Sequence, residues 1–419
     1  PQSVPQQPEL PEQEAEAVEP VEQDEKVESE EFAEQDELAP FVDGSLGTKP
    51  WVRFMAITRD KKLMIGVVII LLAIISWSIF SGNKRRKERI VSEKAAATAQ
   101  IVDQKLADAK EIAPLELSQA LASLESATEE VRDLQEFAAS QKVEDPKEVA
   151  DLQAKIDAAA RSFKKQDEIT ATEYYDLDLI DKDASATRMS IEGDVVALLD
   201  GNRGQVYTVA GEKKASVQYK DAAIKGATAV FISSEKLYVL QPDKGIYVFE
   251  QETKPTLPIK TDEWGAIKDI AVFNGNVYMF DSTKPDVYKY LVAEEGFSAK
   301  QSYFKEGEVP KAFSDGTSMM IDGSLYVATP TRILRYLSGG VSPITLSPPE
   351  EMKMDDIYTT SDLDDIYILD RSHDKIFVFS KDGTYKKQIT SSVISESDDF
   401  GVLSDKTILL LTANKVYKL

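Results

Sequence analysis

The sequence predicts a multidomain protein in which an acidic linker, one membrane-spanning helix and a helical stalk precede an all-β, six-bladed propeller. Three observations predict this order. Residues 63–80 are 18 consecutive residues without a charge. Residues 86–170 contain no glycine and have the composition of helices. Within residues 171–419, a pair of short apolar β-strands recurs six times.

Residues 1–50 predict an acidic, disordered linker. This segment is rich in Pro, Glu and Gln and holds 15 acidic residues against two lysines. Such a composition cannot bury enough apolar surface to offset the entropy of ordering the chain. A solvated spacer is therefore expected, and an acidic docking tail is the alternative. The chain begins at Pro1, so we expect it to be the downstream part of a longer or processed protein.

Composition excludes several classes of chemistry. The formal net charge is −24, and nucleic-acid phosphates require clustered Lys and Arg, so no nucleic-acid partner is expected. The absence of cysteine excludes disulfides and Cys-type zinc sites, and the single histidine, His373, excludes a His-based metal cluster within one chain. No G-x-S-x-G, Walker A, G-x-G-x-x-G or H-E-x-x-H motif occurs. We predict no cofactor, no metal and no catalytic residue.

A transmembrane segment with its flanks is predicted over residues 51–85. Its core begins at Leu63 and ends at Phe80, and at about 1.5 Å per residue it nearly crosses a hydrocarbon layer of about 30 Å. Trp77 lies near one end, where an indole ring favours the interface. A cleaved signal peptide is the alternative, but the core follows a long acidic tract and exceeds a typical signal-peptide core. The predicted location is the plasma membrane, crossed once.

Basic residues flank this core on both sides. Four precede it and five follow it, which favours a cytoplasmic C-terminal flank by one residue. The charge count therefore leaves the orientation nearly balanced. The two sets are Arg53, Arg59, Lys61 and Lys62, then Lys84, Arg85, Arg86, Lys87 and Arg89.

Residues 86–170 predict a helical stalk in three segments, divided at Pro114 and Pro146. Apolar residues recur at alternating steps of three and four, so each helix carries one apolar stripe that needs a partner. The dipeptide 145–146 predicts the start of the third helix, with Asp145 as N-cap. The simplest arrangement is an antiparallel three-helix bundle, and a parallel dimeric coiled coil is the alternative.

Residues 171–419 predict the propeller through a repeat. The first strands of the six pairs start 41, 40, 48, 41 and 42 residues apart. Each pair follows another apolar run and, in most units, precedes a more polar one, and a four-stranded unit of this length is typical of a propeller blade. The six first strands are VALLD (196–200), LYVLQ (237–241), VYMFD (277–281), LYVAT (325–329), IYILD (366–370) and ILLLT (408–412).

The two ends of this domain predict how the ring closes. The last unit ends at Leu419 after its third strand, and an unassigned strand over residues 173–180 precedes the first unit. We expect this strand to pair with the last blade as its outermost strand. Such pairing joins the two ends of the domain and leaves no exposed inner edge.

Residues 366–383, IYILDRSHDKIFVFSKDG, resemble the NHL repeat, in which a hydrophobic strand, Asp, a short polar turn and a second hydrophobic strand precede Asp-Gly. Residues 196–209 and 277–290 resemble it more loosely, and the units that begin at Leu325 and Ile408 carry Thr in place of the aspartate. The resemblance implies a propeller that serves as an interaction module.

The order of segments also resembles the C-terminal half of bacterial signalling proteins. In those proteins a cytoplasmic Ser/Thr kinase or PP2C-type phosphatase is joined through one membrane span to an extracytoplasmic propeller. No kinase or phosphatase motif occurs in these 419 residues. The resemblance therefore implies a non-catalytic half, a catalytic domain upstream of Pro1 and a propeller outside the cytoplasm.

The predicted function is a membrane-anchored sensor or scaffold that binds a protein, peptide or glycan on the propeller rim. One alternative is a hydrolase or lactonase with a metal in the central tunnel. That alternative needs Glu, Asn or Asp on the innermost strands, whereas the runs AVFIS (229–233), AVF (271–273) and MMID (319–322) are largely apolar. Another alternative is that the chain regulates an upstream catalytic domain.

The candidate contact residues are Trp264, Arg332 and Arg371. Trp264 lies in the connection between the second and third blades, which opens on one rim, and an aromatic residue on such a loop is a candidate anchor for a partner. Packing of the Trp264 ring against the neighbouring blade is the alternative.

Other polar residues favour structural interpretations. Asp200, Asp281 and Asp370 end their strands and are expected to bind the backbone of the following turn. His373 lies in a turn and is expected to be a surface residue. The acidic residues of 355–365 lack the spacing of a calcium loop and predict a solvated loop; they are Asp355, Asp356, Asp362, Asp364 and Asp365.

Overall fold

The structure, a computed structural model, describes residues 61–144, 146–210, 215–250, 254–305 and 311–419. The predicted linker 1–50, the predicted helix cap Asp145 and the basic residues Arg53 and Arg59 lie outside the described residues. Contacts divide the chain into two units, residues 1–78 and residues 79–419.

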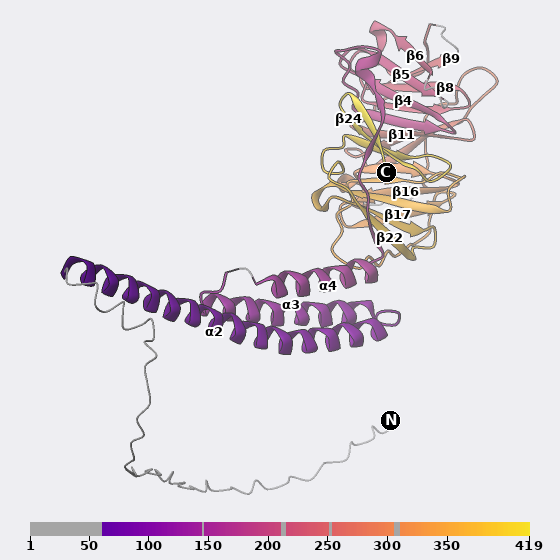
Figure 1. Cartoon of the computed structure of the whole chain (residues 1–419). Coiled ribbons are helices and arrows are strands. Elements are labelled where there is room, and N and C mark those ends of the chain that lie inside the picture. The colour runs from indigo at the N-terminus through magenta and orange to yellow at the C-terminus, as the bar shows by residue number, and fades with distance from the viewer. Residues whose placement is uncertain (1–60, 145, 211–214, 251–253, 306–310) are drawn as a thin grey trace, which may run out of the picture. The chain divides into compact units, whose positions relative to one another are not determined.

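Three helices precede the β-structure (Figure 1). The two breaks between them lie at the predicted prolines, since Pro114 follows the first helix and Pro146 is the N-cap of the third. The apolar core and the first stalk segment, predicted as two separate segments, form one continuous helix. The helices are α2 (Lys61–Ile112), α3 (Leu117–Ser140) and α4 (Lys147–Phe163).

The helix α2 contains one stretch that is long and apolar enough to cross a membrane. Its large apolar side chains are exposed at Met64 and from Val67 to Phe80, and Trp77 is 73% exposed. Consecutive exposed residues over 67–72 cover every face of the helix. A soluble helix normally buries at least one apolar stripe, so this stretch has the surface of a helix in contact with lipid.

The second half of α2 forms a bundle with α3 and α4. Val102 of α2, Leu134 of α3 and Ile156 of α4 are buried in one apolar cluster. Lys105 of α2 binds Glu130 of α3 at 3.0 Å across this bundle. The three predicted apolar stripes therefore find their partners within one chain, and the short turns between the helices make neighbours antiparallel. The parallel dimeric coiled coil stays a prediction.

The remaining chain forms six antiparallel sheets, one for each predicted blade. The innermost strands contact each other in sequence around a ring, and the last of them contacts the first. Blades 1 to 3, each from the inside outward, contain β3 (Arg188–Glu192), β4 (Val195–Asp200), β5 (Gln205–Ala210) and β6 (Ala215–Lys220); β7 (Ala229–Ser233), β8 (Lys236–Gln241), β9 (Gly245–Glu250) and β10 (Thr256–Lys260); and β11 (Ile267–Phe273), β12 (Asn276–Asp281), β13 (Asp286–Tyr290) and β14 (Gln301–Ser302).

Blades 4 to 6 complete the ring. They contain β15 (Ser318–Ile321), β16 (Ser324–Thr329), β17 (Arg332–Leu337) and β18 (Gly340–Val341); β19 (Asp356–Tyr358), β20 (Asp365–Asp370), β21 (Lys375–Ser380) and β22 (Tyr385–Thr390); and β23 (Asp399–Val402), β24 (Ile408–Thr412) and β25 (Lys415–Lys418). The apolar core consists of six clusters, each between two neighbouring blades.

The predicted closure of the ring is confirmed. The strand β2 (Thr172–Asp176) pairs antiparallel with β25 and becomes the outermost strand of blade 6. The predicted strand is too long, however, because 177–179 form the 3₁₀ helix η1 (Leu177–Leu179). The Asp176 carboxylate accepts a hydrogen bond from the Asp178 amide there, which starts the turn and ends the strand.

A second tether was not predicted. The strand β1 (Gln166–Glu168) pairs in parallel with β22 and adds a fifth strand to blade 5. The segment that leaves α4 is thus attached to blade 5 before it closes blade 6. Both attachments are made by residues that precede the first blade.

Candidate functional site: the axial cavity

A cavity of about 340 Å³ lies on the axis of the propeller and is lined by the innermost strands of all six blades. A smaller recess of about 160 Å³ is lined by the other ends of the same strands. Four large side chains line both spaces and separate them with an apolar waist: Ile191, Phe231, Met320 and Tyr358. The larger cavity is the polar one, since charged residues lie at the starts of its strands.

The topology fixes where this cavity opens. In an antiparallel blade, the connection into the innermost strand and the turn between the second and third strands lie at the same rim. The cavity is lined by residues at the starts of the innermost strands, such as Arg188 and Lys268, and by Arg371 from the turn that follows β20. We call this edge of the propeller the cavity rim.

Five aspartates line the cavity, and Asp355 and Asp398 do so from the residues just before β19 and β23. The other three lie on innermost strands: Asp269 on β11, Asp356 on β19 and Asp399 on β23. The expectation that the innermost strands are largely apolar is wrong at these positions. Asp269 lies two residues before the apolar run AVF, and neither Asp356 nor Asp399 belongs to a run that was assigned to an innermost strand. The available sequence signal was the position of Asp269 directly before the apolar residues 270–273 of the same strand.

Two of these carboxylates join neighbouring blades. The Oδ2 atom of Asp399 accepts a hydrogen bond from the Met189 amide of blade 1 at 2.7 Å. The Oδ2 atom of Asp269 accepts one from the Met319 amide of blade 4 at 3.0 Å. The second carboxylate oxygen of each binds the amide of the next residue in its own strand. These carboxylates therefore have a structural role on the ring in addition to facing the cavity.

The hydroxyls of two serines make the same kind of bond between blades. The Ser190 hydroxyl accepts a hydrogen bond from the Ile232 amide at 3.0 Å, and the Ser318 hydroxyl accepts one from the Ile357 amide at 3.0 Å. Four of the six blade junctions thus carry a polar bond on the innermost strands. Polar side chains at these positions are accordingly part of the framework of the cavity.

The electrostatics of the cavity are dominated by burial of like charges. Burial, reinforced by the charge of Asp356, raises the pKa of Asp269 to about 7. Burial and then the Asp356 charge also raise the pKa of Asp399 well above its ordinary value. Burial raises the pKa of Asp356 itself. Asp269 therefore retains its proton at a higher pH than an isolated aspartate does.

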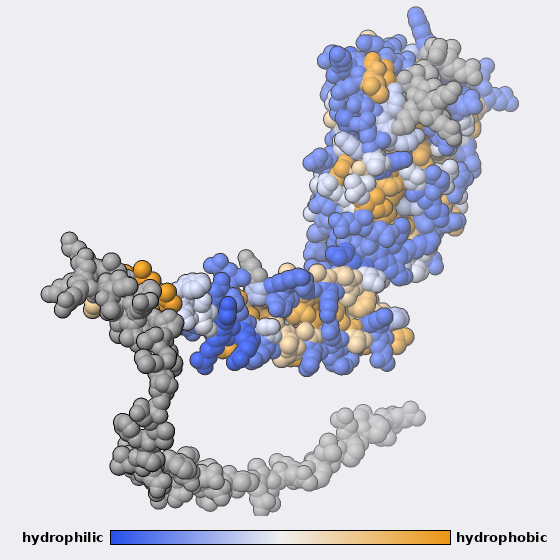
Figure 2. Space-filling model, viewed as in Figure 1, coloured by the Kyte–Doolittle hydropathy of each residue, from blue (hydrophilic) through white to orange (hydrophobic). Residues whose placement is uncertain are grey.

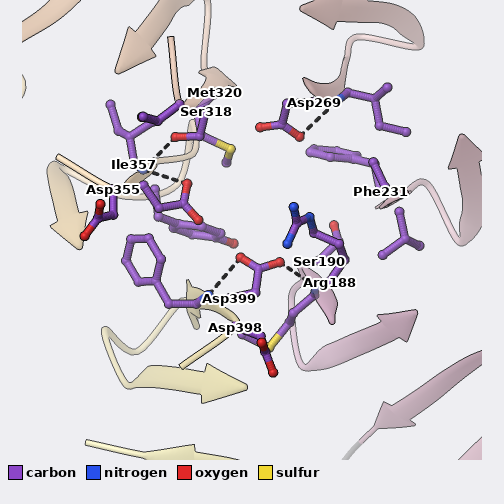
Figure 3. A pocket seen from close by; sticks show the side chains of 18 of the residues that line it. Arg188, Ser190, Phe231, Asp269, Ser318, Met320, Asp355, Ile357, Asp398 and Asp399 are labelled. Carbon is purple, nitrogen blue, oxygen red and sulfur yellow. Dashed lines mark hydrogen bonds between the residues drawn. The ribbon is translucent and has the colours of Figure 1, made fainter. Parts of the chain in front are cut away.

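Arg188 supplies the opposing charge. Its side chain extends between the Asp399 and Asp269 carboxylates (Figure 3). The positive charge of Arg188 acts to lower the pKa of all three carboxyls, but burial outweighs it. Among the described residues, no carboxylate lies within 4.0 Å of the Arg188 guanidinium, so the cavity has space for a ligand or solvent between these groups.

Among the described residues, no three His, Cys, Asp or Glu side chains are grouped so that they can hold a metal ion. The cavity presents carboxyls that can donate or accept hydrogen bonds, the cationic side chains of Arg188, Arg371 and Lys268, and an apolar waist. That combination can bind a small polar group or the tip of a partner's side chain.

The candidate contact residues lie on the cavity rim but do not form one site. Arg371 lines the cavity, and its guanidinium donates to the carbonyls of Ser397 and Asp398 at 2.7 and 2.8 Å. Arg332 is exposed at the first position of β17. Trp264 is half-buried against the cluster between blades 2 and 3. A role in partner contact stays a prediction for all three.

Trp264 has clear packing partners. Its indole N–H donates to the Tyr290 hydroxyl at 2.8 Å, and the two rings meet edge to face with centroids 6.5 Å apart. This geometry matches the alternative in which the ring packs against a neighbouring blade. The rim position of the residue still leaves part of the indole accessible.

The structural interpretation of the strand-end aspartates is confirmed. The Asp200 carboxylate accepts from the Arg203 amide, the Asp281 carboxylate from the Lys284 amide and the Asp370 carboxylate from the His373 amide, at 2.9–3.1 Å. Each also accepts from an amide in the connection that leads into the same blade, which ties two loops of the cavity rim together.

His373 is a turn residue, as expected. Its side chain is 41% exposed, and its Nδ1 atom lies 2.7 Å from Oδ2 of Asp370. The interaction orients the imidazole along the turn rather than into the axial cavity, whose lining does not include it.

The acidic residues of 355–365 form the predicted solvated loop only in part, since Asp362 and Asp364 are exposed. Asp355 and Asp356 line the axial cavity, whereas Asp362 lines the recess at the opposite rim. Asp365 is buried and binds Lys386. The prediction is wrong for Asp355, Asp356 and Asp365 because the short strand β19 begins within this segment and carries Asp356 inward.

The comparisons with known proteins agree with this fold. A family model described as a 6-bladed beta-propeller matches residues 331–392, which run from β17 through β22. No curated protein sequence matches the chain. Together with the six sheets, the match defines the class of the C-terminal region as a six-bladed β-propeller.

Solved propellers of differing function are similar to the chain. Virginiamycin B lyase from Staphylococcus aureus is 12% identical with a TM-score of 0.44, covering 59% of this chain and 98% of the lyase. A calcium-binding protein, regucalcin from Agrobacterium tumefaciens, is 11% identical with a TM-score of 0.40, covering 60% and 95%. The WD40 propeller domain of Doa1 is 12% identical with a TM-score of 0.38, covering 56% and 92%. At such identities the activities of these proteins are not carried over to this chain.

Proposed function

We propose that this chain is a membrane-anchored binding module whose propeller receives a ligand or a partner's side chain at the cavity rim. The observation that carries the proposal is the axial cavity, in which Arg188 and the three carboxyls face one space without pairing directly. Asp399 is buried and Arg188 is exposed at the first position of β3, and charged groups held apart around a cavity can bind a polar group that enters it.

The wider context is part of the same proposal. The apolar stretch of α2 anchors the chain in the plasma membrane, and the propeller belongs to an NHL-like class of interaction modules. The chain forms the non-catalytic half of a signalling protein, with the propeller outside the cytoplasm. What supports this orientation is the order of segments, which resembles that of membrane kinases and phosphatases with external propellers. Amine-reactive labelling of whole cells tests it, because external propeller lysines would react before lysis.

The alternative is a hydrolase or lactonase with a metal in the tunnel. The presence of Asp269, Asp356 and Asp399 on innermost strands favours it. The backbone bonds that already occupy two of these carboxylates disfavour it. Elemental analysis of the full chain discriminates the two functions. One calcium or zinc per chain, lost on Asp356→Asn substitution, would favour the hydrolase.

Site-specific photocrosslinking in intact cells tests the binding proposal. A photoreactive amino acid at Lys268 or Arg332 places the probe on the cavity rim, and the same amino acid at Asp194 or Asp405 places it on the opposite rim. All four side chains are exposed, so the substitutions preserve the fold. We expect discrete adducts from the cavity rim alone. Equal labelling from both rims, or adducts from neither, would overturn the proposal.

A further inference from the structure

We propose that the membrane-proximal end of the helical bundle binds the phosphate of an anionic phospholipid headgroup. This inference rests on the membrane anchor of the proposed function and assigns that anchor a lipid preference. The site comprises Lys84 and Lys87 of α2 and Lys142 from the turn between α3 and α4, and we call it the lysine recess.

The position along α2 matches the headgroup layer. Five of the six residues 84–89 are basic, and the segment begins four residues after Phe80, where the apolar stretch ends. Figure 2 shows hydrophilic residues following the hydrophobic ones along this helix. At about 1.5 Å per residue, Lys84 lies about 6 Å beyond Phe80 along the helix axis. The headgroup region on each side of a bilayer is roughly 5–8 Å thick, so the Lys84 ammonium reaches the level of the phosphates.

The fold adds a third lysine from a distant part of the chain. The chain leaves α3 through a tight turn in which Lys142 has a left-handed backbone with φ of 59°. The Lys142 amide donates to the Ala139 carbonyl at 2.9 Å, and the Val143 amide donates to the Ala138 carbonyl at 3.0 Å. These bonds cap the helix and fix the turn beside the start of the bundle. The lysine recess, with a volume of about 340 Å³, is lined by Lys84, Lys87, Lys142, Glu88, Val143 and Glu144.

The charges in and around the recess remain available to an anion. Lys84 is 3.8 Å from Glu88 and Arg89 is 3.5 Å from Glu93, both in exposed pairs within α2. Exposed ion pairs of this kind contribute little to stability, so their lysine and arginine side chains can bind another anion instead. Within the described part of the chain, neither Lys87 nor Lys142 lies within 4.0 Å of a carboxylate. Two acidic residues therefore oppose three lysines in the recess, and the exposed Arg85 and Arg86 adjoin it in sequence.

The position of the lysine recess beside the apolar stretch of α2 favours a lipid phosphate over a soluble anion as its ligand. A basic residue at an anionic membrane surface strengthens binding by roughly fivefold. Three lysines held by two elements of a folded bundle present their ammonium groups together, without the entropy cost of gathering a flexible tail. The recess lies at the end of the bundle that adjoins the apolar stretch, where the local concentration of lipid phosphate is highest.

Native mass spectrometry of the full chain in detergent micelles tests this inference. Phosphatidylglycerol and phosphatidylcholine are supplied at equal concentration, and retained lipid is counted for each protein. We expect the native chain to retain the anionic lipid at least tenfold over the zwitterionic one. The triple variant K84Q/K87Q/K142Q should lose this preference. The matched variant K94Q/K110Q/K182Q, which removes the same charge from exposed lysines elsewhere, should keep it.

Each outcome decides the question. A preference that survives in the recess variant, or disappears in the matched variant, overturns the inference. Displacement of the lipid by millimolar inorganic phosphate assigns the recess to soluble anions and also overturns it. Insertion into pure phosphatidylcholine vesicles, measured as resistance to alkaline carbonate, tests the anchor separately. A chain that inserts but shows no lipid preference refutes the lysine recess alone, and one that does not insert refutes the proposed anchor.

Discussion

The Asp399 carboxylate accepts a hydrogen bond from the backbone amide of Met189, with 2.7 Å between Oδ2 and N. This bond joins the innermost strand of the last blade to that of the first. On the outer side of blade 6, β2, which precedes blade 1 in the chain, pairs with β25. The ring is therefore closed at both its inner and its outer circumference, by residues far apart in the sequence.

Two substitutions of Asp399 separate its role as hydrogen-bond acceptor for the Met189 amide from its role as an ionisable group in the cavity. Asp399→Ala leaves the buried Met189 amide without an acceptor, which should destabilise the propeller by about 1–3 kcal/mol. Asp399→Asn keeps a carbonyl oxygen for that amide, so it should destabilise the fold less than Asp399→Ala does. Chemical denaturation followed by near-ultraviolet circular dichroism measures both. Equal destabilisation by the two variants would contradict the assigned hydrogen bond.

The raised pKa of Asp269 predicts an unusual dependence of stability on pH. Its pKa of about 7 in the folded chain lies above that of an unfolded aspartate, about 3.9, so folding favours the protonated carboxyl. The stabilisation is fully present below pH 4 and is lost as the pH rises through 7. We therefore expect the propeller to become more stable by roughly 1–2 kcal/mol between pH 8 and pH 5.5.

Asp269→Asn provides the control for this pH effect. The amide keeps an acceptor for the Met319 N–H and cannot ionise. Its denaturation midpoint should vary less between pH 5.5 and 8 than that of the native chain. A native chain whose stability falls steadily with acid over this window would show that the axial carboxyls are ionised in the fold.

The contacts of Glu350 are expected to stabilise the pairing of β1 with β22, which attaches the segment after α4 to blade 5. Its carboxylate binds Lys164 at 2.6 Å, Gln388 at 2.7 Å and Lys375. Burial opposes ionisation of Glu350, but these three donors outweigh it and leave the pKa below its usual value. The ion pairs are therefore retained at neutral pH and lost as the pH falls through that lowered value.

Glu350→Ala should leave half-buried lysines unpaired and weaken the parallel pairing of β1 with β22. Hydrogen exchange at the Ile169 amide, which donates to Thr390 at 2.9 Å, measures this pairing directly. We expect faster exchange by roughly tenfold, the equivalent of about 1.4 kcal/mol, with little change in blades 1 to 3. The neighbouring exposed Glu351→Ala serves as control and should leave exchange unchanged.

The propeller was predictable because each blade repeats a pattern that local sequence can display. The paired strands such as VALLD and QVYTV carry apolar side chains on both faces, and Asp200 and Asp370 mark the turns between their strand pairs. The axial site was not predictable in the same way. Asp269, Asp356 and Asp399 come from three blades and meet only through ring closure, and a single aspartate at a strand start looks like a solvated turn residue.

The segments before the propeller likewise include features that local sequence predicts and one feature that depends on tertiary contacts. Pro114 and Pro146 mark local breaks, so the three-segment division followed from sequence. The strand β1 did not, because Gln166, Asp167 and Glu168 are polar and their pairing depends on the neighbouring β22. Its stability derives from tertiary contacts rather than from strand propensity.

Arg188 provides the sharpest test of the axial cavity. Its charge lowers the pKa of Asp269, Asp356 and Asp399, although no carboxylate of the described chain lies within 4.0 Å of it. Arg188→Gln should therefore raise those pKa values further and move the pH midpoint of the stability change upward, by about half a unit to one unit. Lys268→Gln removes a charge from the same cavity lining on β11 and is the matched control. Nuclear magnetic resonance titration of the aspartate carboxyl carbons reports the pKa values directly. Unchanged carboxyl titration in the Arg188 variant would show that the guanidinium does not act on these groups, and the cavity would lose the charge arrangement on which the binding proposal depends.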